Sequence, residues 1–423
     1  MKEKPKILFV PVASKLHEKK IFKATLEMRK ILERKLDVLG PKKLVLSLKD
    51  FSRVKVKDFD LGVVFVGSGG ASKTITNIAS NKDWFIVAYD ENNSLPSALS
   101  AKEKMVSMGK WRGKIVYTNL QEEPKDVVYA AYGFKALKTL KKVRIGVFGA
   151  GKNTWEKIKF TKKYFGVKVK VFPLKKLFST LKEKLAENVE DELKRRLGEK
   201  WVCKVSREDL VKAFRFYLAM KKVMEEEGLD CITFDCFKYL KSLGGTPCLP
   251  FSLLNDENFL GVCENEVSYA PLMFIMREIS GKPVWLANLA KVDFQNNTVL
   301  LTHCTAATKL SGKDGKVILK PHFESGLGVS LDVPLGRGFV TLAHLRLKPP
   351  TLIVVEGEIL RSQLGLKNEC RSQAYVRLDG DVKRFFEETG NHHVVGYGLY
   401  GLTLALISEK IGLKPLVLGL YKQ

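Results

Sequence analysis

Residues 61–70 read LGVVFVGSGG, an unbroken apolar run that ends in a glycine-rich turn. A run that is apolar at every position predicts a strand buried on both faces, as in a parallel sheet covered by helices. Similar runs flank it, ILFVPVAS at 7–14 and DWFIVAYDE at 83–91. Helices with apolar spacing are expected after these strands, at about 18–35, at 72–80 and from about Leu95. Strands that alternate with helices predict an α/β layer.

A second unit of the same kind begins at Val143 with VRIGVFGAG. The elements expected after it are a helix from about Thr154, a strand at 167–174, helices at 177–198 and 207–227, and a strand at 229–235. Ser206 can cap the last of these helices and Gly228 can end it. Asp235 then lies at the carboxyl end of a strand, where open α/β sheets place ligand-facing groups.

From about Thr246 the pattern changes to short strands separated by Gly and Pro turns, which predicts a mainly antiparallel β domain. The strand candidates are VWLANLA, TVLLTHCTA, KVILKPHF, FVTLAHLRL, TLIVVEGEIL, QAYVRLDG and HHVVGYG, with a closing helix at about 400–412. Lys-rich sequence at about 120–142 suits a boundary between the first two domains. We therefore expect three domains, with the bounds 1–140, 141–255 and 256–423.

Composition indicates a globular protein of the reducing cytoplasm. The 423 residues are 45% hydrophobic, enough for a large core. The apolar runs are strand-sized, far below the roughly 20 residues that cross a bilayer. The N-terminal sequence does not resemble a signal peptide. The seven cysteines all follow residue 200 and show no C-x-x-C spacing.

The net charge of +26 raises the question of an anionic partner. The excess is mostly Lys, dispersed along amphipathic segments such as LKTLKKVR. A dispersed Lys excess with many Glu residues is typical of a heat-adapted surface. Binding of nucleic acid and steering of anionic small ligands are the alternatives.

Histidines cluster in the last third of the chain, where five of the six lie beside strand-like sequence. Imidazole is the commonest metal ligand, so a site is expected there, although ordinary strand-end histidines would give the same pattern. His392 and His393, in TGNHHVVGYG at 389–398, are neighbours in a predicted strand. Neighbours in a strand point to opposite faces, so at most one of the two should enter a given site.

The segment GVCENEV at 261–267 carries two carboxylates, Glu264 and Glu266. In an extended chain they project to the same side and can share a divalent cation. Alternatively, they are surface acids before the helix expected at about 269–279, where negative charge is favoured. Two more histidines end strands, in THCT and PHFESGLG. The candidates for one shared metal site are Glu264, Glu266, His303, His322 and His392.

Two glycine loops resemble phosphate-binding loops without completing the pattern. GVFGAGKNT at 146–154 has Asn153 where a P-loop needs Ser or Thr for magnesium, and Thr154 where a dinucleotide fingerprint needs its third glycine. GSGGASKT at 67–74 has Ser72 in place of the later glycine. A P-loop kinase therefore remains a third hypothesis.

Four segments together resemble the L-fucose isomerase-like proteins, relatives of the L-fucose and L-arabinose isomerases. They are TGNHHVVGYG, residues 245–276, LTHCTA and PHFESGLG. ENNSLPSALSA at 91–101 and VRIGVFG are similar to the two Rossmann-like domains of that group in a more generic way. The resemblance covers most of the chain and is specific in about its last 180 residues.

The resemblance implies two Rossmann-like α/β domains followed by a β-rich C-terminal isomerase domain. It also implies an aldose–ketose isomerase of carbohydrate metabolism that holds a divalent metal, typically manganese, and moves a proton between C1 and C2 through a cis-enediol. The acidic metal ligand of the family corresponds to Glu266 and its histidine ligand to His392. His322 resembles the additional histidine ligand of arabinose isomerases. A homotrimer or homohexamer is implied as well.

One family glutamate, both ligand and proton shuttle, has no counterpart here, because Phe251 in LPFSLLN stands at about that place. Glu264, Asp235 or Asp256 are the candidates to replace it. The catalytic residues expected on this basis are Glu266, Glu264 and Asp235. The alternatives are a metal-binding or sugar-binding protein without catalysis, and a basic nucleic-acid-binding protein on the same scaffold.

Overall fold

The computed structural model describes residues 3–15, 18–182, 189–196, 201–257, 259–313 and 315–421. The chain forms two compact units, residues 1–135 and 136–423. The helix expected at 177–198 is described only in part, because 183–188 and 197–200 lie outside these ranges.

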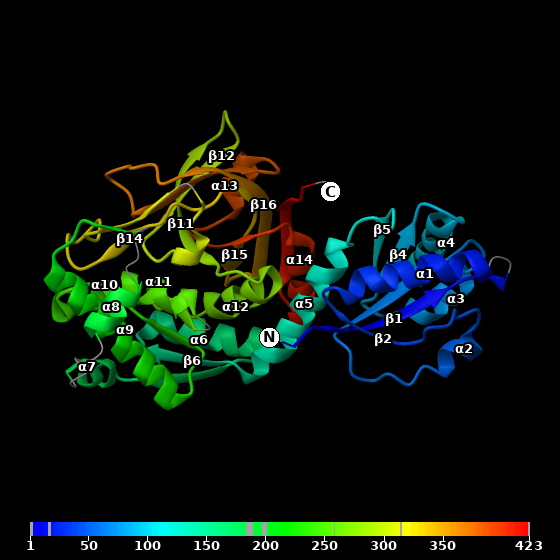
Figure 1. The fold of residues 1–423 in the computed structure, drawn as a ribbon, viewed down its shortest axis with the longest axis horizontal. Coiled ribbons are helices and arrows are strands. Elements are labelled where there is room, and N and C mark those ends of the chain that lie inside the picture. Colours follow the sequence, from blue (N-terminus) through cyan, green and yellow to red (C-terminus); the bar gives the residue numbers. More distant parts are fainter. Residues whose placement is uncertain are drawn as a thin grey trace. The chain divides into compact units, whose positions relative to one another are not determined.

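The N-terminal unit contains a parallel sheet with the strand order β2-β1-β3-β4-β5 (Figure 1). This is one of the two common orders of doubly wound sheets. The predicted strands and helices are confirmed, and Ile75 and Ala98 of the helices share a core with Val10 and Val64 of the sheet. The elements are β1 Lys6–Val12, α1 Glu18–Glu33, β2 Asp37–Leu39, α2 Leu48–Ser52, β3 Leu61–Val66, α3 Ser72–Ala79, β4 Phe85–Tyr89, α4 Ser94–Ser107 and β5 Lys114–Thr118.

Helix α5, Lys125–Thr139, occupies most of the Lys-rich stretch at 120–142, followed by the short helix η2, Leu140–Lys142. Its apolar side chains Val127, Ala130, Ala131 and Phe134 are buried. They recur at helical spacing, and the lysines at 125, 135 and 138 lower the mean hydropathy of the segment although one face of the helix is apolar. The division between the two units falls inside this helix.

A second parallel sheet, β10-β9-β6-β7, forms the first layer of the C-terminal unit. Ser206 caps α9 by accepting a hydrogen bond from Asp209 N, and Gly228 ends it at φ +60°, as predicted. The elements of this layer are β6 Arg144–Phe148, α6 Lys152–Phe165, β7 Lys168–Phe172, α7 Leu174–Lys182, α8 Val189–Arg196, α9 Arg207–Glu227, β9 Cys231–Phe234, α10 Cys236–Leu243, α11 Cys248–Asp256, β10 Leu260–Val262 and α12 Tyr269–Ser280.

The β-rich part is a closed barrel, a feature that the sequence did not predict. Six antiparallel strands run in the order β15-β18-β11-β12-β17-β16, and pairing of β15 with β16 closes the ring. Strand β19 adds to β16 in parallel, an exception to the antiparallel expectation. The elements are β11 Trp285–Asp293, β12 Thr298–His303, η4 Thr308–Leu310, β15 Gly338–Arg346, β16 Thr351–Ser362, β17 Ser372–Leu378, α13 Val382–Glu388, β18 His392–Tyr397, α14 Gly401–Ile411 and β19 Lys414–Gly419.

A small third sheet, β14-β13-β8, lies outside the barrel. The predicted strand KVILKPHF is β13, Val317–Lys320, which pairs with β14, Ser330–Asp332, and with β8, Trp201–Cys203. This sheet therefore joins β8, which precedes α9 in the sequence, to two strands of the β-rich part.

Helix α12 connects the second sheet to the barrel, since it contacts both β10 and β18. Figure 1 shows α11 and α12 beneath the barrel strands and above β6 and α9. One continuous core runs through these layers, from Phe214 and Phe234 to Trp285 and Val355. The turn between β10 and α12 therefore lies where the parallel layer meets the barrel.

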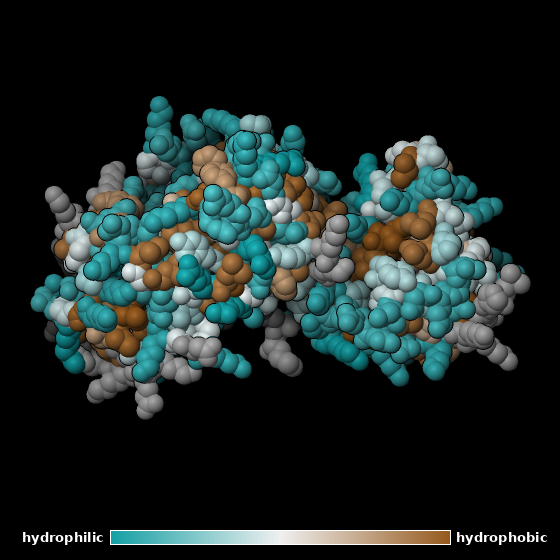
Figure 2. All heavy atoms as spheres, turned by 90° about the horizontal axis from the view of Figure 1, so that it is seen from above, coloured by the Kyte–Doolittle hydropathy of each residue, from teal (hydrophilic) through white to brown (hydrophobic). Residues whose placement is uncertain are grey.

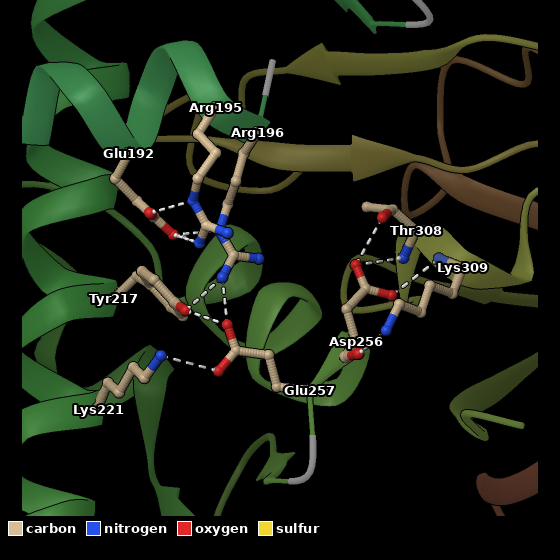
Figure 3. Close-up of polar contacts among 9 residues, drawn as sticks. All are labelled: Glu192, Arg195, Arg196, Tyr217, Lys221, Asp256, Glu257, Thr308 and Lys309. Carbon is tan, nitrogen blue, oxygen red and sulfur yellow. Dashed lines mark hydrogen bonds and ion pairs between the residues drawn. The ribbon is translucent and has the colours of Figure 1, made fainter. Parts of the chain in front are cut away.

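Two acidic residues at the end of α11 are used as structural anchors (Figure 3). Asp256, one candidate for the missing glutamate, accepts hydrogen bonds from Thr308 N and Oγ1 and from Lys309 N, at 3.2, 2.5 and 2.8 Å. Glu257 accepts hydrogen bonds from Arg196 and Tyr217 and lies 3.1 Å from Lys221 Nζ. Both carboxylates hold elements together, so neither is left to serve a site.

The surface is polar over most of the face drawn in Figure 2, with hydrophobic groups between the hydrophilic ones. Within the described part of the chain, no helix combines the length and the apolarity needed to cross a membrane.

Candidate active site

The segment that carries Glu264 and Glu266 is a tight turn and not an extended strand. Glu264 and Asn265 have φ values of +57° and +52°, in the left-handed region that few residues other than glycine occupy. Backbone hydrogen bonds from Asn265 N to Phe234 O and from Glu266 N to Cys263 O hold the turn. The extended conformation assumed from the sequence is therefore wrong. The two carboxylates nevertheless face the same imidazole.

The barrel supplies two histidines from one of its ends. His303 is the last residue of β12 and His392 is the first residue of β18. Strand β11 lies between these strands, and its Asn288 pairs with Thr302 on one side and with His392 on the other. The two imidazole rings are 6.4 Å apart, centre to centre.

Glu264 lies between these two imidazoles. Its Oε1 is 3.8 Å from His303 Nε2, and its Oε2 is 3.4 Å from His392 Nε2. Burial disfavours the ionised carboxylate, but the hydrogen bonds and charges of the two histidines outweigh burial and hold the pKa of Glu264 well below its usual value. Glu264 is therefore an anion at neutral pH.

Glu266 contacts the opposite ring nitrogen of His392. Its Oε1 is 3.5 Å from His392 Nδ1 and also accepts a hydrogen bond from Lys157 Nζ of α6. A histidine whose Nδ1 faces a carboxylate presents the lone pair of Nε2 on its other side. Glu266 and Lys157 therefore orient His392 toward Glu264.

Tyr269 and His344 fix the backbone of His392. The hydroxyl of Tyr269, the first residue of α12, donates to His392 O at 3.0 Å, and His344 Nδ1 is 2.8 Å from the same oxygen. Tyr269 Oη also lies 3.0 Å from His344 Nδ1. Burial lowers the pKa of His344, which keeps its ring neutral. These contacts hold the first residue of β18 in place.

His393 lies apart from the carboxylates that face His392, as alternation along a strand predicts. It is completely buried, and its backbone pairs with that of Ala287 in β11. Its Nε2 lies 2.6 Å from Thr389 Oγ1, and its Nδ1 lies 3.0 Å from Asn391 O. Burial lowers the pKa of His393 to about 3, so the ring is a neutral core residue.

Of the residues expected from the sequence, the structure brings together Glu264, Glu266, His303 and His392. His322 instead belongs to a separate group with Cys248 and Cys304. Asp235 follows β9, next to Cys236, whose sulfur is 3.3 Å from Cys263 Sγ. No contact described here joins the Asp235 carboxylate to the histidines.

Phe251 cannot act at the place of the missing glutamate. It is fully buried in α11, with its ring 5.4 Å from that of Phe234. A Cβ atom on Gly261 would lie 2.5 Å from Phe251 Cδ1, so the Phe251 ring occupies the space that a side chain at position 261 would need. The side chain is part of the core.

The donors around Glu264 fit a divalent cation. A metal bound at about 2.0–2.2 Å by nitrogen and oxygen ligands separates neighbouring donors by about 3–4 Å, in line with the 3.4 and 3.8 Å separations of Glu264 from the histidines. His392 Nε2 is buried, and its 3.4 Å contact with Glu264 Oε2 does not form a hydrogen bond of ordinary geometry. A ligand held by both atoms would satisfy this nitrogen.

Sequence reasoning missed three residues of this site, Lys157, Tyr269 and His344. Lys157 is one lysine among many on α6, and Tyr269 reads as an ordinary first residue of a helix. His344 lies inside a strand, and only the pairing of β15 with β18 brings it to His392. Local spacing carries no signal for contacts of this kind.

Comparison with known proteins points to the class of sugar isomerases. No family model matches the chain. Curated relatives with modest identity are named as sugar isomerases, which supports that class and does not single out L-fucose isomerase.

Three of these relatives are proteins named sulfoquinovose isomerase. The protein of Alkalicoccus urumqiensis is 29% identical over 249 residues, with 54% of each chain covered. That of Priestia aryabhattai is 28% identical over 170 residues, with 38% of each covered. That of Clostridium sp. (strain MSTE9) is 26% identical over 338 residues, with 72% of each covered. The chain thus spans about half, or less, of the first two relatives.

Proposed function

We propose that the protein is a metal-dependent aldose–ketose isomerase of carbohydrate metabolism. The observation that carries the proposal is the position of Glu264, ionised and buried between His303 and His392 at one end of the barrel. The names of the relatives support the reaction class, and suggest a sugar of the sulfoquinovose kind as substrate.

Glu264, His303 and His392 would hold the metal, which we propose to be Mn²⁺ because the resemblance implies it; two imidazoles and a carboxylate suit several divalent first-row ions. When bound, such an ion polarises the oxygens of an open-chain sugar and lowers the cost of negative charge on them. Glu266 would orient His392 and serve the proton transfer, although the resemblance assigns the ligand role to it.

The proton transfer requires a carboxylate beside the substrate carbons. We assign this role to Glu266, whose Oε1 contacts His392 Nδ1 and accepts a hydrogen bond from Lys157 Nζ. Asp235, at the carboxyl end of β9, remains the second candidate. Burial raises the pKa of Asp256, but its hydrogen bonds to Thr308 and Lys309 tie it to the structure.

The test is a panel of aldoses that includes sulfoquinovose, incubated with purified protein and added Mn²⁺, with ketose formation measured. We expect turnover that a chelator abolishes and that added metal restores. Glu264→Gln should reduce kcat/KM by at least about 100-fold, the order of effect of losing one preorganised charged contact. Glu358→Gln, which removes only a partner of Arg377 on the barrel, is the matched control.

Absence of conversion for every sugar in the panel, with metal bound and the protein folded, would leave a metal-binding protein without this activity. Equal turnover by Glu264→Gln and by the control would remove Glu264 from the mechanism. The first outcome would overturn the isomerase proposal, and the second would overturn only the role assigned to Glu264.

A further inference from the structure

Four of the seven cysteines lie in two pairs, although they are scattered singly along the sequence. Cys236 and Cys263 form one pair, with their sulfurs 3.3 Å apart. Cys248 and Cys304 form the other, with their sulfurs within 4.8 Å of one another. The exposed Cys203 and the buried Cys231 have no such neighbour among the contacts of the described residues.

The second group includes an imidazole. Cys248 Sγ, Cys304 Sγ and a ring nitrogen of His322 all lie within 4.8 Å of one another. These three residues are 3%, 2% and 6% exposed, so the donors face one another in a space closed to solvent.

The three residues come from different parts of the C-terminal unit. Cys248 begins α11, Cys304 follows β12, and His322 follows β13. The group therefore joins the parallel layer, the barrel and the small sheet. Nothing in the local sequence around any one of them predicts this convergence.

The contacts around the donors resemble those that orient metal ligands. Arg371 N donates a hydrogen bond to Cys304 Sγ at 3.5 Å. His322 Nδ1 lies 3.0 Å from Ser325 Oγ, which leaves Nε2 as the nitrogen available to a ligand. Outer hydrogen bonds of this type fix the tautomer of a ligating histidine and the direction of a thiolate lone pair.

We propose that Cys248, Cys304 and His322 bind a thiophilic divalent cation, zinc by their chemistry. Thiolate and imidazole are ligands of protein-bound zinc, with Zn–S near 2.3 Å and Zn–N near 2.0–2.1 Å. Donors at these distances from a shared ion stand about 3.3–3.8 Å apart, which is compatible with three donor atoms that lie within 4.8 Å of one another. The site would tie the three layers together.

This donor set differs from the one proposed for the sugar. It shares no residue with Glu264, Glu266, His303 and His392, although Cys304 directly follows His303 and Cys263 Sγ lies within 4.8 Å of donor atoms of Glu264 and His303. Its two thiols select a softer ion than carboxylate and imidazole do. The inference does not depend on the isomerase proposal, and each can fail without the other.

The experiment is a Co²⁺ titration of the purified, metal-free protein, followed by absorption spectroscopy. Thiolate ligands give cobalt an intense near-ultraviolet charge-transfer band, which oxygen and nitrogen ligands lack. We expect one equivalent of cobalt to produce this band, and zinc to remove it by displacement. Glu264→Gln should leave the band unchanged.

Cys248→Ser should lose most of the band, whereas Cys231→Ser, a buried cysteine outside the group, should keep all of it. Circular dichroism reports whether each variant folds. His322→Gln keeps every thiol and is the second variant, with cobalt affinity expected to fall at least about tenfold.

Absence of a thiolate band in the wild-type protein would overturn the proposal, as would an equal band in Cys248→Ser. Titration of free thiols under denaturing conditions should give all seven cysteines of the chain. A disulfide between Cys248 and Cys304 would also overturn it, because that bond consumes both sulfur donors.

Discussion

His392 and His393 are neighbours with opposite surroundings. His392 faces two carboxylates, and His393 lies among the apolar side chains of the barrel. Alternation along a strand predicts that their roles differ, since successive side chains point to opposite faces. Which of the two enters the site depends on the pairing of β18 with β11 and β15, and that pairing cannot be derived from the local sequence.

Substitution of each histidine should therefore have a different effect. His392→Gln should lower Mn²⁺ affinity at least about tenfold, because it removes a ligand, and leave thermal stability nearly unchanged. His393→Gln should cost about 1–3 kcal/mol of unfolding free energy, because it disturbs two buried hydrogen bonds, and leave metal affinity intact. Isothermal titration calorimetry and thermal unfolding measure the two effects. Similar losses of metal affinity in both variants would contradict the assignment.

Glu264 and Glu266 lie near one another for a different reason from the one that the sequence suggested. The sequence suggested that both acids serve one cation because an extended chain would turn them to the same side. They meet at His392 because Glu264 and Asn265 adopt left-handed conformations. Glutamate rarely adopts a left-handed conformation, and the sequence CENE at 263–266 does not indicate this turn.

At the scale of elements, the strands and helices of the two parallel sheets were predictable because their signals are local. Continuous apolar runs identify β1, β3 and β4, and Ser206 and Gly228 mark the ends of α9. Helix α11 was missed, since CLPFSLLND is buried on every side and shows no helical periodicity. Periodicity detects a helix only where one face meets water.

Helix α11 also explains why a glutamate at position 251 would not restore the family pattern. Phe251→Glu should destabilise the unit strongly, because it buries an unpaired carboxylate where the Phe234 ring now packs. Phe251→Ala should cost about 3–5 kcal/mol through the cavity left. Thermal unfolding of both variants, with Phe251→Met as the conservative control, provides the comparison. A stable Phe251→Glu variant with increased metal affinity would show that this position does reach the site.

The Glu257 cluster predicts a pH dependence of stability (Figure 3). Burial raises the pKa of Glu257, but hydrogen bonds from Tyr217, Arg196 and Lys221 outweigh it and lower the pKa below the usual value of 4.5. The stabilisation from the ionised form is therefore fully present above about pH 4.5 and is lost as the pH falls through the value in the folded protein.

Glu257→Gln should lower stability by about 1–2 kcal/mol at pH 7, a value reduced for partial exposure. The difference from wild type should shrink below pH 4.5. Unfolding followed by calorimetry between pH 7 and pH 3.5 measures both effects, with Glu358→Gln as the control for an exposed pair. A difference that grows on acidification would contradict the expected sign.

At the scale of the whole molecule, the sequence predicted the order of layers and not the closure of the barrel. Seven strand candidates were correctly identified, but KVILKPHF joins a separate sheet, and β15 meets β16 to close the ring. Closure depends on pairings between residues far apart in the chain. The cysteine group has the same origin and was equally invisible in the sequence.

The positive charge is dispersed, and many lysines are paired with acids, as Lys157 is with Glu266. One cavity of about 1170 Å³, away from the proposed site, has basic side chains and no acidic one among the residues that line it, including Lys282, Arg337 and Arg361. We expect a DNA duplex to bind measurably only at low salt and to dissociate near 0.2 M, because such contacts are purely electrostatic.

Fluorescence anisotropy from 0.05 to 0.3 M salt tests this expectation. Arg337→Glu combined with Arg361→Glu should abolish the remaining low-salt binding. Tight, salt-resistant binding of a particular sequence would instead favour the nucleic-acid hypothesis over the isomerase.

Strand β18 is paired on both sides, with β11 and with β15. Inserting a single residue just before it would slide every side chain by one place and exchange the inward and outward histidines. His393 would then face the carboxylates, and His392 would point into the core of the barrel. Pairing on both sides resists this shift of register, so the closed barrel also determines which of the two histidines faces the carboxylates.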